Sequence, residues 1–86
     1  MISVARIQAR DRRQAAIHEA GHYVIGRWRG VGIQWPMIWP TKTPDLNSEK
    51  TWVGHVQFTP NIRISAENGR LIGVAGAIAE NFTRDP

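Results

Sequence analysis

The sequence contains no cysteine. A chain without cysteine forms no disulfide, binds no metal through a thiolate and uses no thiol as a nucleophile, which excludes cysteine proteases, cysteine-ligated zinc modules and thiol redox enzymes. It also lacks an uninterrupted apolar run of about 18 residues, so no membrane-spanning segment is predicted. Its N-terminal residues lack the basic segment and long apolar core of a secretory signal, and we therefore expect a cytoplasmic protein.

Acidic residues are few. The chain has 7 Asp and Glu against 11 Lys and Arg, a formal net charge of +4, and the arginines concentrate before residue 30. A basic patch of this kind can attract nucleic acid or an anionic membrane surface. Aromatic and basic residues do not alternate as they do on surfaces that track a nucleic-acid strand. The pattern therefore favours a solvated helix face, and nucleic acid is the less favoured partner.

The length of 86 residues predicts a single domain over residues 1–86, with a small core. The first expected element is a helix over residues 12–28, because apolar residues recur there at three- and four-residue spacing. Asp11 followed by Gln14 has the form of a capping box, which predicts Asp11 as the N-cap. Gly30 is the expected C-cap.

The periodicity then changes. Residues 31–35 alternate as a strand does, Pro36 restricts this strand to an edge or ends it, and residues 37–39 can resume it. Residues 40–50 are polar and predict a loop. Residues 51–58 alternate again, so the two strands are expected to pair as a hairpin with a long loop.

A second helix is predicted from Ser65, as N-cap, to about residue 81. Gly69 and Gly73 lie four residues apart within it and predict a smooth stripe that another helix could approach closely. The expected fold class is α+β, with two helices packed on a small antiparallel sheet.

The sequence His18-Glu19-Ala20-Gly21-His22 matches the pattern H-E-x-x-H within the first predicted helix. Residues four apart on a helix share one face, so His18 and His22 can bind one zinc ion. Glu19 is then placed to act as general base on a metal-bound water. The residue types and the helical context together predict a hydrolytic zinc site.

The motif and its surroundings resemble the peptidase domain of the FtsH-type AAA proteases. Residues 12–26 resemble the zinc-binding helix of that family, and residues 32–40, 52–60 and 71–80 resemble its next strands and helix in order. Only the first segment is specific by itself. The resemblance implies a minimal zincin-like fold, Zn²⁺ as cofactor and hydrolysis of peptides or unfolded proteins. Oligomers of the chain, or a separate ATPase partner, are also implied by the family.

The sequence departs from that family in two respects. No G-x-x-x-x-G-K-[ST] phosphate loop is present, so the chain is not expected to bind ATP by itself. The family's third zinc ligand is an Asp well beyond the residues matched here. Either the domain is truncated at its C-terminus, or Asp85 or Glu80 substitutes, or the metal has two protein ligands only. His55, on the second strand, is a further candidate ligand or hydrogen-bond donor, and Glu80 could instead orient a histidine.

The preferred interpretation is thus a zinc metalloendopeptidase-like domain. A catalytically incomplete module that binds peptides or protein partners is the alternative, suggested by the missing third ligand and by the 4 tryptophans. An anion-binding module that uses the early arginines is a third hypothesis.

Overall fold

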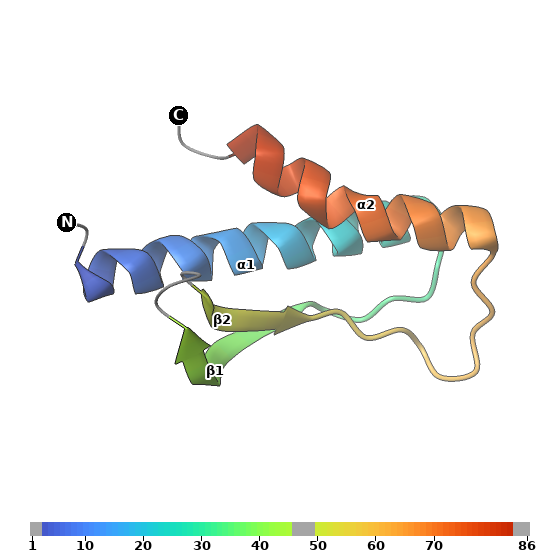
Figure 1. Cartoon of the computed structure of the whole chain (residues 1–86). Coiled ribbons are helices and arrows are strands. Elements are labelled where there is room, and N and C mark those ends of the chain that lie inside the picture. The colour runs from blue at the N-terminus through green and yellow to red at the C-terminus, as the bar shows by residue number, and fades with distance from the viewer. Residues whose placement is uncertain (1–2, 46–49, 84–86) are drawn as a thin grey trace.

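The structure is a computed structural model that describes residues 3–45 and 50–83. It contains α1 (Val4–Trp28), β1 (Met37–Asp45), β2 (Lys50–His55) and α2 (Ala66–Thr83). The long helix α1 lies in the middle, with α2 packed along one side and the hairpin along another (Figure 1). The α+β class predicted from the sequence is confirmed, with two helices and a two-stranded antiparallel sheet.

Helix α1 begins earlier than the sequence predicted. Ser3 is the N-cap, and its hydroxyl oxygen accepts a hydrogen bond from the backbone N–H of Arg6 at 3.2 Å. The prediction of Asp11 as N-cap is wrong, because Asp11 lies inside the helix and is buried there. At the other end the C-cap is Arg29, so the prediction of Gly30 is wrong by one residue. Gly30 follows the cap with φ of 71°, in the left-handed region that the residue after a helix commonly needs.

The strands form the expected antiparallel hairpin, with shifted limits. Met37 pairs with His55 and Trp39 with Val53, whereas of residues 31–35 only Ile33 makes a bridge, to Phe58. The predicted loop over residues 40–50 is wrong as far as Asp45, where β1 ends, and at Lys50, where β2 begins. The second strand ends at His55 rather than at residue 58. Among the described residues the sheet has two strands, so one edge of β1 is unpaired. A proline such as Pro40 is tolerated in such a strand, because its missing N–H can lie on the unpaired edge. Residues 46–49 lie outside the described part of the chain.

Helix α2 confirms the predicted cap, since the Ser65 hydroxyl accepts from the backbone N–H of Asn68 at 3.1 Å. The predicted Gly69–Gly73 stripe is not where the helices meet. A Cβ at Gly73 would have no atom within 4 Å, whereas one at Gly21 would lie 2.5 Å from the carbonyl oxygen of Ala75 and one at Gly76 2.9 Å from the His18 ring. The close approach therefore uses one glycine from each helix.

The core is small and contains polar groups. Its buried hydrophobic residues are Ile7, Val31, Ile33, Ile72 and Ala75. Three polar side chains are buried beside them, those of Asp11, Glu19 and Thr51. On another face of the helix pair, a groove of about 470 Å³ runs between α1 and α2 and is lined by apolar side chains, those of Val24 and Ile78 among them. Neither helix, over the residues described, is both long and apolar enough to cross a membrane.

Candidate metal centre

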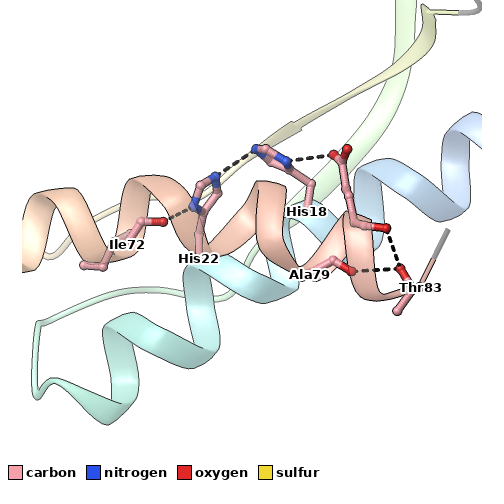
Figure 2. Close-up of polar contacts among 6 residues, drawn as sticks. His18, His22, Ile72, Ala79 and Thr83 are labelled. Carbon is pink, nitrogen blue, oxygen red and sulfur yellow. Dashed lines mark hydrogen bonds and ion pairs between the residues drawn. The ribbon is translucent and has the colours of Figure 1, made fainter.

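The two histidines of the H-E-x-x-H motif face each other. They lie one turn apart on α1, and their Nε2 atoms are 2.9 Å apart (Figure 2). The rings meet edge to face, with centroids 4.5 Å apart. The helix period that predicts a shared face for residues four apart is therefore realised with both Nε2 atoms converging on one point.

The other nitrogen of each ring is engaged by α2. The Nδ1–H of His22 donates to the backbone carbonyl of Ile72 (Figure 2). Nδ1 of His18 lies 2.8 Å from a carboxylate oxygen of Glu80. The second contact is an ion-pair approach rather than a well-aligned hydrogen bond. Histidines that bind metals use this arrangement widely, because an acceptor behind the ring fixes its tautomer and orientation.

These contacts determine what can lie between the rings. A carbonyl oxygen only accepts, so His22 carries its proton on Nδ1 and presents a lone pair at Nε2. The Glu80 carboxylate favours a proton on Nδ1 of His18 as well. The 2.9 Å approach of the two Nε2 atoms is a hydrogen bond, in which Nε2 of His18 donates to the lone pair of His22. A metal ion bound between the rings would take the place of that proton.

The spacing suits a tetrahedral metal. Bonds of about 2.0–2.1 Å from zinc to two histidine nitrogens, at a tetrahedral angle, separate those nitrogens by about 3.3 Å. The observed 2.9 Å is shorter by a few tenths of an ångström, a difference that small ring rotations supply. The donor set of His18, Glu19 and His22 has ligand atoms within 4.8 Å of one another, and it is the group in residues 3–45 and 50–83 that could hold a metal ion.

Glu19 is the unusual member of the group. The residue is only 7% exposed, yet it makes no hydrogen bond or ion pair to any residue that the structure describes. Its carboxylate oxygens keep some contact with solvent, because the residue borders two clefts. This arrangement is typical of a group that meets a ligand, a metal or a reacting water.

Glu19 lies where two clefts adjoin. One cleft of about 610 Å³ extends past His22 and is lined mainly by apolar residues, among them Phe58 and Ile64. The other, of about 370 Å³, extends past His18 toward Asp11 and Glu80. Both are bounded by Glu19 and by Gly54 of β2. Glu19 therefore lies at the boundary between the two clefts.

The remaining predicted site residues are placed differently. Glu80 contacts the far nitrogen of His18 and is outside the group of possible ligands, so its position fits an orienting role. His55 lines the larger cleft but is also outside that group. Asp85 lies outside the described residues.

Sequence reasoning did not find two of the residues that build this site. Asp11 accepts hydrogen bonds from the backbone N–H groups of Thr51 and Trp52, at 2.6 and 2.7 Å, and so attaches β2 to α1. Its spacing of seven and eleven residues from the two histidines indicates a shared helix face, which is a signal that could have been used. Ile72 contributes a backbone carbonyl, and no side-chain pattern indicates such a role.

Comparisons with known proteins find no family model that matches the sequence and no similar curated protein or solved structure. The resemblance of the motif region to the FtsH-type peptidases therefore stays a prediction.

Proposed function

We propose that the chain is a zinc-dependent metalloendopeptidase-like domain with a minimal zincin-like arrangement. The convergence of the two Nε2 atoms carries the proposal. The fold engages the opposite nitrogen of each ring and leaves the two Nε2 atoms facing one point, beside the carboxylate of Glu19. Histidines that bind a metal commonly have an acceptor of this kind behind the ring.

Each residue then has a distinct task. His18 and His22 would hold Zn²⁺, which when bound would supply a Lewis acid and lower the pKa of a water to about 7. Glu19 accepts a proton from the attacking water and delivers it to the leaving amine as the peptide C–N bond breaks and the new C–O bond forms. The clefts on either side of Glu19 leave room for the chain segments that flank the scissile bond.

The third zinc ligand is the open element of the proposal. Catalytic zinc sites typically have three protein ligands and a water. Glu80 approaches the nitrogen of His18 that points away from the convergence point, so it orients the ring rather than completing the ligand set. The third ligand is then Asp85 or a residue supplied by a longer or a second chain, and the substrate is a peptide or an unfolded protein in the cytoplasm.

A second candidate function is a peptide-binding module that has lost the chemistry. One observation favours it. Among the described residues, the group that could hold a metal consists of His18, Glu19 and His22, so a third ligand is missing from that group if Glu19 acts as the base. Such a module would bind peptides in the same clefts without cleaving them.

The test is zinc per chain, measured by elemental analysis on protein without a histidine tag. Wild type is compared with His22→Ala, and His55→Ala serves as the matched control because His55 lies outside the ligand group. We expect about one zinc in wild type and in His55→Ala and none in His22→Ala. Equal zinc in all three, or zinc in none, would contradict the proposal.

Cleavage is measured on the same samples with internally quenched peptides. Zinc with cleavage supports the peptidase. Zinc and peptide binding without cleavage support the binding module instead.

A further inference from the structure

Strand β2 packs closely against α1 at Gly54. Side chains alternate along the strand, so Trp52 and Gly54 share one face. That face points to α1, where Trp52 meets the guanidinium of Arg12 and Gly54 meets the side chain of Glu19. The absence of a side chain at residue 54 is what makes room for Glu19.

A Cβ at residue 54 could not coexist with Glu19 as it lies. It would overlap Cγ of Glu19, and it would lie 2.8 Å from both Cδ and Oε2. Non-bonded carbon atoms rest at about 3.5–4.0 Å, so the whole outer half of the Glu19 side chain would have to move.

No other described group holds that carboxylate in place. Glu19 makes no hydrogen bond or ion pair, so contact alone fixes its position. Gly54 of β2 and Glu19 of α1 both border the two clefts. Gly54 therefore sets the position of the carboxylate at the boundary between the two clefts.

We propose that Gly54 is the positioning residue for Glu19, and that its lack of a side chain holds the carboxylate beside the two histidines where the clefts adjoin. The contact itself is independent of any metal. Its chemical meaning rests on the proposed function, in which Glu19 is the base.

The contact is tested first without metal or substrate, by a double-mutant cycle in thermal stability. Gly54→Ala is made in wild type, in Glu19→Ala and in Glu19→Gln. We expect it to lower Tm by about 5 °C or more in wild type, in the range that overpacking causes. Glu19→Gln retains the atoms that overlap and should keep the loss, whereas Glu19→Ala removes them and should abolish most of it.

Gly73→Ala is the control, because a Cβ there meets no atom within 4 Å. It should not lower Tm. If Gly54→Ala lowers Tm equally in all three backgrounds, Gly54 serves the strand backbone only and the proposal is overturned. Should the single variant fail to fold, folding of Gly54→Ala together with Glu19→Ala would still support it, and failure of both would overturn it.

The functional consequence is tested separately on the zinc-loaded protein. Gly54→Ala should keep the zinc content of wild type, since the atoms nearest to an added Cβ belong to Glu19 rather than to His18 or His22. It should lower kcat about 100-fold with KM changed less than a few-fold. A variant with unchanged kcat would overturn the positioning role. Wild type without zinc or cleavage would refute the proposed function, while the stability cycle would still decide the contact.

Discussion

Asp11 and Glu19 are two carboxylates of the same helix, buried to nearly the same extent, with 8% and 7% of their surface exposed. Asp11 accepts two hydrogen bonds from the backbone N–H groups that begin β2, whereas Glu19 accepts none from the described residues. Burial therefore does not distinguish a structural acid from a chemical one, but the presence of partners does. A carboxylate that the fold satisfies stabilises the fold, and one that it leaves unsatisfied is available for a ligand.

The largest effect is expected from Glu19→Gln. The amide keeps the shape of the side chain but cannot accept the proton, so peptide cleavage by the zinc-loaded protein should fall by about 10³-fold. Zinc content and Tm should stay close to wild type, because the side chain makes no hydrogen bond in the fold. Initial rates with a quenched peptide measure the change, and undiminished cleavage would show that Glu19 is not the base.

Asp11→Ala should have the opposite signature. It leaves the N–H groups of Thr51 and Trp52 without an acceptor at the start of β2, which should lower the free energy of unfolding by about 3 kcal/mol. Urea denaturation measures it. Asp11→Asn keeps an acceptor oxygen and should lose less. If Asp11→Ala loses under about 1 kcal/mol, the contrast between the two carboxylates does not hold.

Glu80→Ala should act on the metal rather than on the fold. Its carboxylate lies 2.8 Å from Nδ1 of His18, and under the proposed function it orients the ring, so its removal should weaken zinc affinity by about 10–100-fold. Competition with a chromogenic chelator measures the affinity. Glu80→Gln, which can still accept from Nδ1, should lie between wild type and Glu80→Ala, and an unchanged affinity in both would remove Glu80 from the site.

The smallest effect is expected from Thr51→Val. The hydroxyl of Thr51 lies 3.4 Å from the Asp11 carboxylate, a long contact beside the two shorter backbone bonds. Its loss should lower the free energy of unfolding by less than about 1 kcal/mol in urea denaturation. A loss as large as that of Asp11→Ala would mean that the hydroxyl, not the backbone, is the main partner of the carboxylate.

The sequence predicted what depends on local spacing. The helical period placed His18 and His22 on one face, and Ser65 capped α2 as expected. It failed at Asp11, because an Asp followed by Gln three residues later has the same pattern whether it caps a helix or accepts from a distant strand. Only Ile7 adds a buried apolar residue to the first turns, so the apolar period there was too weak to extend the helix back to Ser3.

Features that depend on distant pairing were not predictable. Pro40 indicated a loop, yet a strand with an unpaired edge accommodates it. The predicted contact stripe of α2 was based on the spacing of glycines within that helix. Close packing depends instead on which face of α2 meets α1, and that face contains Gly76. The acceptor for His22 is a backbone carbonyl, a group that every residue has.

The contacts of the two histidines differ greatly in their separation along the chain. His18 and His22 are 4 residues apart, whereas the carbonyl behind His22 belongs to a residue 50 positions later. A helix α1 formed early in folding would thus already present a two-nitrogen chelate, before α2 arrives to fix the rings. We therefore expect zinc to act as a folding template, with weak capture by the isolated helix followed by much tighter retention once the chain has closed around it.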